Sequence, residues 1–242
     1  METQENKVVI ITGASSGIGE ATARSLVKSG AKVALCARDE EKLKKLVSEL
    51  GEENALYLKA DVADIEKMKE LVKLTKKKFG RVDVLFANAG VMPGSNVSEL
   101  KVDDWKMMVD ININGVLNSI AAVYPLFLSN NKGQIIVTSS VAGTKSVPGN
   151  AVYCGTKHFV RSFIDSFRSE IISEGKNIRT TIIYPGAVKT NLLDTVAESD
   201  AKRAVEAFYE EVAINKEDIA RAVLYAISEP DNIDVSDIVI RS

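Results

Sequence analysis

Short apolar runs alternate with stretches of helical periodicity along the first half of the chain. The apolar runs predict buried strands, because such strands read as short continuous apolar segments bounded by turn residues. These strands are expected at Val8–Ile11, Lys32–Ala37, Ala55–Lys59 and Val82–Ala87. The intervening segments predict helices over Ile18–Lys28, Asp39–Leu50 and Ile65–Phe79. This alternation indicates a parallel sheet covered by helices on both faces, with right-handed crossovers.

The second half of the chain continues the same alternation. Strands are expected at Gln134–Thr138, Ile178–Tyr184 and Ile238–Ile240. Helices are expected over Val102–Ser129, where Pro125 should bend the last part, and over Val152–Glu174 and Lys216–Ser228. Residues 191–214 carry a helical patch at 201–211 and no strand signal. No linker or repeat divides the chain, so residues 1–242 are interpreted as one α/β domain. The predicted fold is a Rossmann-like doubly wound parallel sheet of about seven strands.

A glycine-rich turn follows the first predicted strand and reads Thr12-Gly13-Ala14-Ser15-Ser16-Gly17-Ile18-Gly19. Glycines here permit a tight turn and let a pyrophosphate approach backbone N–H groups, and the dipole of the following helix favours that anion. The spacing differs from the general dinucleotide fingerprint. Such a turn also occurs for packing alone, but its place after the first strand favours dinucleotide binding. Ser15 and Ser16 would add hydroxyl donors.

The end of the second predicted strand bears on which nicotinamide cofactor fits. An acidic residue there would bond the adenine ribose hydroxyls and repel a 2′-phosphate. This chain has Ala37 followed by Arg38, and a guanidinium suits a phosphate. The sequence therefore favours NADP(H) over NAD(H), unless Arg38 is a surface charge that pairs with neighbouring Asp39.

Tyr153 and Lys157 lie four residues apart in a predicted helix and can share one face of it. A phenol normally loses its proton near pH ~10. A nearby ammonium stabilises the phenolate and lowers that pKa. The pair could then move a proton at physiological pH, although the pattern alone occurs by chance in many proteins.

Composition argues against several other classes of function. The 242 residues carry a formal net charge of −2, which gives no electrostatic case for nucleic acid or for an anionic membrane. With one His and two Cys, a His/Cys metal cluster is not expected, and we predict no metal site. The start of the chain is polar, and we see no signal peptide and no apolar run of transmembrane length. A cytoplasmic location is therefore expected.

Six ordered motifs make the chain similar to the classical short-chain dehydrogenase/reductase family over nearly its whole length. They are Thr12–Gly19, Asn88-Ala89-Gly90, Asp110–Gly115, Thr138-Ser139-Ser140, Tyr153 with Lys157, and Pro185–Thr190. Ser140 lies thirteen residues before Tyr153, which is the usual spacing of that family.

The resemblance implies catalytic roles for four residues. Tyr153 would be the general acid in carbonyl reduction and the base in alcohol oxidation, and Lys157 would lower its pKa and hold the nicotinamide ribose. Ser140 would hydrogen-bond the substrate oxygen and position it. Asn112 would hold a water that links Lys157 to solvent, with Asn114 as the competing assignment.

The resemblance also implies a set of NADP(H) contacts around the same cleft. Asp61 and Val62 would flank the adenine, Asn88 the nearby ribose, and Val188 and Thr190 the nicotinamide amide. The full set expected to bind the cofactor is Gly13, Ser15, Ser16, Gly17, Ile18, Gly19, Ala37, Arg38, Asp61, Val62, Asn88, Ala89, Gly90, Tyr153, Lys157, Pro185, Gly186, Val188 and Thr190.

Structural alternatives exist for three of these residues. Ser140 could merely end a strand, and Asn112 could satisfy backbone groups at a helix kink. Asp61 could cap the helix that starts near Asp64.

Residues 191–214 are expected to form the substrate lid, because loops at the carboxyl ends of parallel strands carry specificity. Apolar side chains there could wall the pocket, or could pack against the domain or a neighbouring subunit: Leu192, Leu193, Val196, Phe208 and Tyr209. Met92-Pro93-Gly94 and Val141–Asn150 are further pocket candidates. No basic anchor for a carboxylate stands out, with Lys145, Lys189 and Lys202 as the candidates.

These observations predict an NADP(H)-dependent oxidoreductase that transfers a hydride between nicotinamide and a small carbonyl or alcohol, such as an aldehyde, ketone or 3-hydroxy acid. The C-terminal residues depart from the pattern of 3-oxoacyl-thioester reductases, which stay an alternative, as does a non-catalytic NADP-binding regulator. The helices at 102–129 and 152–174 carry apolar residues on more than one side, so a homodimer or homotetramer is expected.

Overall fold

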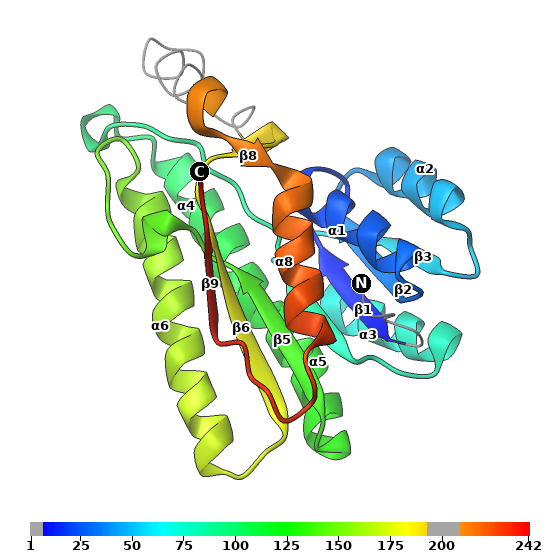
Figure 1. The fold of residues 1–242 in the computed structure, drawn as a ribbon. Helices are drawn as coiled ribbons and strands as arrows, with labels where there is room; N and C mark the ends of the chain where they lie inside the picture. Colours follow the sequence, from blue (N-terminus) through cyan, green and yellow to red (C-terminus); the bar gives the residue numbers. More distant parts are fainter. Residues whose placement is uncertain (1–6, 193–208) are drawn as a thin grey trace.

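A seven-stranded parallel sheet forms the centre of the protein in a computed structural model that describes residues 7–192 and 209–242 (Figure 1). The strands are β1 (Val8–Thr12), β2 (Lys32–Ala37), β3 (Ala55–Lys59), β4 (Val84–Ala87), β5 (Gly133–Thr138), β6 (Ile178–Pro185) and β9 (Asp237–Ile240). Their order across the sheet is β3-β2-β1-β4-β5-β6-β9, and every pairing is parallel. The predicted Rossmann-like fold class is confirmed.

Helices cover both faces of the sheet, as its apolar strands require. They are α1 (Gly17–Lys28), α2 (Glu40–Leu50), α3 (Ile65–Phe79), α4 (Val102–Val109), α5 (Gly115–Asn130), α6 (Ala151–Ser173) and α8 (Lys216–Ser228). Alternate residues of one strand therefore enter different cores. Along β1, Val9 and Ile11 pack in the core with α1 and α8, whereas Ile10 packs in the core with α3 and α5.

The long helix predicted over 102–129 is interrupted in the structure. Between α4 and α5, residues Asp110–Asn114 form a π-turn, a local widening that is frequent at functional sites. The apolar periodicity continues through this turn, which explains why the sequence suggests a single helix.

The expectation of no strand within residues 191–214 is wrong at its last residue. A second, two-stranded parallel sheet pairs β7 (Val188–Lys189) with β8 (Ile214–Asn215), and Val188 lies opposite Ile214. Two residues are too few to leave a periodic signal in the sequence, so this pairing depends on tertiary contact.

The helical run Val102–Asn130 contains an 18-residue window with a mean hydropathy of 1.4, so it meets the length and composition of a membrane span. The expectation that no run of that length exists is therefore wrong. The core helix of a water-soluble protein meets the same criterion. In this fold α5 packs on the sheet, with Val116, Ile120, Val123 and Phe127 buried.

Candidate active site

A cleft of about 1030 Å³ opens at the carboxyl ends of the central strands. This is the edge at which ligands bind in open α/β sheets. Every predicted catalytic and cofactor-binding residue lines the cleft except Gly19 and Asn112. The topology therefore brings together residues that are up to 177 positions apart, from Gly13 to Thr190.

The glycine turn after β1 packs tightly against the loop that follows β4. Gly13 has a φ of +65°, and a Cβ there would lie 2.8 Å from the Ala89 Cα. A Cβ on Gly19 would collide with the Gly13 carbonyl oxygen, so glycine at this position permits the tight turn although it does not line the cleft. Thr12, which sequence reasoning did not select, ties the two loops: its Oγ1 accepts hydrogen bonds from the N–H groups of Asn88 (3.0 Å) and Ala89 (3.1 Å).

The start of α1 fits the pyrophosphate of a dinucleotide. Ser16 occupies the N-cap, but its side chain caps none of the first N–H groups of the helix. Ser16, Gly17 and Ile18 all line the cleft. N–H groups in a first helical turn have no acceptor within the helix, and the dipole favours an anion beside them.

Arg38 lines the cleft at the end of β2, immediately after buried Ala37. The alternative in which Asp39 pairs with Arg38 is not what the structure shows. Asp39 caps α2 by accepting from the Lys42 N–H (3.1 Å), and it pairs with the Lys42 ammonium at 3.3 Å. Within residues 7–192 and 209–242, Arg38 forms no ion pair.

Asp61 lies in the cleft after β3, and it does not cap the next helix. Its Oδ1 accepts from the Ala63 N–H at 3.0 Å. Asp64 is the cap of α3, because its Oδ1 accepts from the N–H groups of Glu66 (2.9 Å) and Lys67 (3.2 Å). The capping alternative for Asp61 is therefore wrong.

Ser140 and Tyr153 meet at the other end of the cleft. Ser140 follows β5, and its Oγ accepts from the Ala142 N–H (3.1 Å) and makes a long contact of 3.5 Å to the Pro185 carbonyl. Tyr153 comes from the first turn of α6, and the Ser140 hydroxyl acts to lower its pKa. Both side chains are buried.

Lys157 lies one turn further along α6 and is also buried. Its Nζ donates to the Thr138 carbonyl at 2.8 Å and lies 5.7 Å from the centroid of the Tyr153 ring. Burial lowers the pKa of Lys157 from 10.5 to about 8. The ammonium is therefore poised to lose its proton just above neutral pH.

Burial raises the pKa of Tyr153 above its ordinary value, and the Ser140 hydroxyl opposes this in part. Lys157 does not bring the pKa of Tyr153 below its ordinary value in the chain without a cofactor. The ammonium points to the Thr138 carbonyl, and desolvation of the phenol outweighs the lowering effects. The phenol accordingly keeps its proton at neutral pH.

Asn112 lies in the π-turn, fully buried, and its side chain clamps the loop after β4. Its Oδ1 accepts from the Val91 N–H (2.9 Å), while its Nδ2 donates to the Val91 carbonyl (3.0 Å) and to Thr156 Oγ1 (3.2 Å). These bonds match the alternative in which Asn112 satisfies backbone groups. Asn114 is exposed and donates to Asp110 (3.1 Å), so it is not positioned at the cleft.

Comparison with known proteins decides the family. Residues 7–201 match the family model described as short chain dehydrogenase. An uncharacterised oxidoreductase of Listeria monocytogenes is 48% identical over 237 residues, which cover 97% of this chain and 96% of the relative. Another from Staphylococcus saprophyticus is 44% identical over 100% of this chain and 98% of the relative. The chain belongs to the short-chain dehydrogenase family.

Solved structures of this family resemble the chain closely. A serine dehydrogenase complexed with NADP+ has a TM-score of 0.90 and 30% identity, covering 97% of this chain and 94% of its own. An alcohol dehydrogenase from Thermococcus sibiricus, complexed with 5-hydroxy-NADP, has a TM-score of 0.85 and 30% identity over 98% of this chain and 96% of its own. A 3-ketoacyl-(acyl-carrier-protein) reductase from Brucella melitensis complexed with NADH has a TM-score of 0.87 and 28% identity over 99% and 98%.

Some of the residues expected to line the substrate pocket of this short-chain dehydrogenase do line the cleft. Met92, Leu192 and Tyr209 line the cleft, together with several residues of the loop at 141–150. Pro93 contributes to a separate small hollow instead. Leu193, Val196 and Phe208, with most of the expected lid at 191–214, lie outside the described residues.

Proposed function

We propose that this short-chain dehydrogenase uses NADP(H) to interconvert a small carbonyl compound and its alcohol, with Tyr153 as the general acid and base. The observation that carries the proposal is that the Ser140 and Tyr153 hydroxyl groups lie in one cleft. The pair lines the same cleft as the glycine turn and Arg38. One cleft can thus hold a dinucleotide and present two hydroxyl groups to a reacting oxygen.

The two hydroxyl groups would stabilise the charge that develops during reduction. A bound nicotinamide supplies the hydride, and negative charge grows on the carbonyl oxygen of the substrate. Tyr153 holds its proton at neutral pH, because burial raises its pKa, and can donate that proton to the oxygen. The contact of Ser140 to the Pro185 carbonyl is long, at 3.5 Å, so its hydroxyl can turn to the substrate at little cost.

Lys157 would hold a positive charge beside this pair at neutral pH, because its pKa of about 8 lies above 7. The charge favours proton loss from Tyr153 in the direction of alcohol oxidation. Lys157, Asn88 and the Pro185–Gly186 segment would hold the nicotinamide half of the cofactor.

Arg38 supports the preference for NADP(H). Its guanidinium lines the cleft, has no ion-pair partner in the part of the chain that the structure describes, and follows neutral Ala37. A free guanidinium at this place suits a 2′-phosphate, whereas NAD offers it a neutral hydroxyl. Solved relatives are known with NADP+ and with NAD.

A screen of cofactor oxidation tests the proposal. NADPH and NADH are offered with short aldehydes, ketones and 3-oxo acids, and the absorbance at the nicotinamide band is followed. We expect turnover with NADPH, and we expect Tyr153→Phe to lose about 10²–10⁴-fold in kcat while the affinity for NADPH stays unchanged. Normal turnover by Tyr153→Phe would contradict the acid role.

The same screen, with 3-oxoacyl thioesters added, separates two other functions. A 3-oxoacyl-thioester reductase, which the similarity to the Brucella melitensis enzyme keeps in view, would turn over acyl thioesters and not the free acids. A non-catalytic regulator would bind NADPH but would not oxidise it with any of the substrates offered.

We also propose that the enzyme works as a homodimer or homotetramer. Phe159 and Phe163 stack on α6 with their ring centroids 6.1 Å apart, and Phe159 is 37% exposed. An aromatic surface of this kind on a long helix suits contact with a second copy. Sedimentation at micromolar concentration measures the state, and a monomer would refute the assembly.

A further inference from the structure

Charge is divided unevenly along the active-site cleft. Its β2–β3 end is lined by Arg38 and by two carboxylates, Asp39 and Asp61. At the end that holds Tyr153, the charged side chains among the described residues are three cations: Lys145, Lys157 and Arg241. No described carboxylate lines this end, so an anion there would meet no repulsion from the described walls.

Arg241 reaches this end of the cleft because β9 is the edge strand next to β6. Ile240 pairs with Pro185, and its carbonyl accepts from the Gly186 N–H at 2.8 Å. A Cβ on Gly186 would lie 2.9 Å from the Arg241 Cβ, so glycine permits this close approach. Ser140 contacts the carbonyl of neighbouring Pro185. The stem of Arg241 therefore starts close to the backbone that Ser140 touches.

The alternation of β9 sends Arg241 toward the cleft and away from the core. Ile238 and Ile240 pack against the core shared with α1 and α8. Val239 and Arg241 carry the opposite phase, and both line the cleft. The C-terminus lies at this edge of the sheet in Figure 1.

Lys145 approaches from the loop that starts at Ser140. Val141–Gly143 form a single 3-10 turn capped by Ser140, and the Lys145 N–H donates to the Val141 carbonyl at 3.2 Å. Neither Lys145 nor Arg241 forms an ion pair within the described residues, and both are exposed. Lys189, another expected anchor, does not line the cleft, and Lys202 lies outside the described residues.

We propose that Arg241, assisted by Lys145, binds the carboxylate of the substrate, which makes this a reductase of short oxo acids or a dehydrogenase of the corresponding hydroxy acids. This inference rests on the proposed carbonyl–alcohol function. A guanidinium can hold a carboxylate through two parallel hydrogen bonds, and this would orient the carbonyl toward Ser140 and Tyr153. Arg241 and Lys145 would then determine specificity without taking part in proton transfer.

Matched acids and esters test the anchor. The probes are 2-oxobutanoate, 3-oxobutanoate and 4-oxobutanoate, each beside its methyl ester, with NADPH as the cofactor. We expect Arg241→Gln to lose about 10–100-fold in kcat/KM for the acid that is turned over best, and less than about 3-fold for its ester. Lys145→Gln should show the same selectivity with a smaller loss. Arg221→Gln, an exposed change on α8 outside the cleft, serves as the matched control.

A binding measurement tests whether Arg241 holds the carboxylate even if no substrate is turned over. Calorimetric titration of 3-hydroxybutanoate and its methyl ester into the protein, with and without NADPH, should show weaker binding of the acid alone in Arg241→Gln. Equal losses for acid and ester, no loss for either, or a weakened affinity for NADPH would each overturn the anchor. An absence of turnover with every substrate would refute the proposed function, and the titration would still decide the anchor.

Discussion

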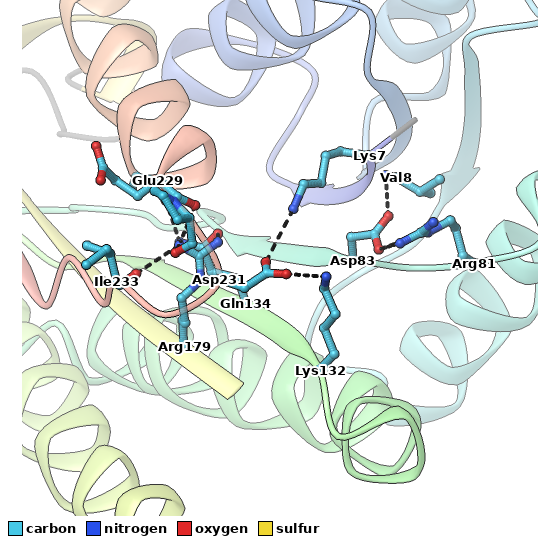
Figure 2. A network of polar contacts seen from close by, with 12 residues as sticks. Lys7, Val8, Arg81, Asp83, Lys132, Gln134, Arg179, Glu229, Asp231 and Ile233 are labelled. Carbon is cyan, nitrogen blue, oxygen red and sulfur yellow. Dashed lines mark hydrogen bonds and ion pairs between the residues drawn. The ribbon is translucent and has the colours of Figure 1, made fainter. Parts of the chain in front are cut away.

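The amino and carboxyl ends of the strands form two edges of the central sheet, and these differ in how their charged side chains are paired. At the amino edge, shown in Figure 2, charged groups form hydrogen bonds and ion pairs with other residues of the chain. At the carboxyl edge, three cations line the cleft with one hydrogen-bond partner or no ion pair among the described residues: Lys157, Arg38 and Arg241. Both edges belong to one sheet, so the difference arises from the side chains and loops placed there.

Arg179 illustrates the amino edge. Its guanidinium is buried and donates to the carbonyls of Glu229 (3.1 Å) and Ile233 (3.0 Å) and to Gln134 Oε1 (2.9 Å). These bonds tie the chain between α8 and β9 to the start of the sheet. Asp83 similarly accepts from the Val8 N–H at 2.8 Å and pairs with Arg81. These bonds satisfy the buried guanidinium and the buried carboxylate from within the chain.

Lys157 illustrates the carboxyl edge. It is equally buried, but the Thr138 carbonyl is the one hydrogen-bond partner of its ammonium within the described residues. Arg38 and Arg241 line the same cleft without ion pairs among the described residues. A buried or partly enclosed charge that lacks partners costs stability, and a ligand can supply what is missing. The proposed active site therefore lies at the edge whose charges have fewer partners.

The largest effect is expected from Arg179→Met at the amino edge. The change leaves the Glu229 and Ile233 carbonyls and the Gln134 side chain without their donor, which should lower the free energy of unfolding by about 3–5 kcal/mol. Urea unfolding measures the loss, with exposed Arg221→Gln as the control. The affinity for NADPH should be unchanged in the folded variant. An unfolding midpoint equal to that of the native protein would show that the edges do not differ in this way.

Lys157→Met should change how the free energy of unfolding depends on pH. The folded pKa of Lys157 is about 8 and its ordinary value is 10.5, so between these pH values the unfolded state binds more protons. The stability of the native protein should therefore rise, relative to the variant, by about 3 kcal/mol across this window. Urea unfolding of both proteins at a series of pH values measures the difference. A difference that is constant with pH would mean that Lys157 keeps an ordinary pKa.

Arg38→Asp should change which cofactor the carboxyl edge accepts. The variant loses the guanidinium and gains a carboxylate that repels a 2′-phosphate. The ratio of kcat/KM for NADPH over NADH should fall by about 10-fold or more. Lys45→Asp on α2, an exposed residue outside the cleft, makes the same change in net charge and should leave the ratio unaltered. An equal shift in both variants would reject a specific contact.

The smallest effect is expected from Lys132→Ala. Lys132 pairs with Asp231 at the amino edge, but both side chains are at least half exposed. Water and salt screen such a pair, so the loss should be at most about 1 kcal/mol and should vanish in 1 M salt. Thermal unfolding at low and high salt measures it. A larger loss that persists in salt would show that this pair supports the Arg179 network.

Local patterns in the sequence were sufficient for the seven strands of the central sheet and for most of the predicted residues along the cleft. Apolar runs, glycines after a strand and the spacing from Ser140 to Tyr153 are all short-range features, and every predicted catalytic and cofactor-binding residue except Gly19 and Asn112 lines the cleft. The π-turn at Asp110–Asn114 was missed, because it inserts into a continuous apolar periodicity.

Long-range contacts decided the rest. The position of Arg241 beside Gly186 follows from the pairing of β9 with β6, and no nearby residue signals it. The clamp of Asn112 on Val91, the β7–β8 pair and the aim of the Lys157 ammonium at Thr138 likewise join distant segments. Periodicity and spacing report what a residue does within its own helix or strand. Its burial, its partners and therefore its pKa depend on which other segments pack around it, and these are set when the chain folds.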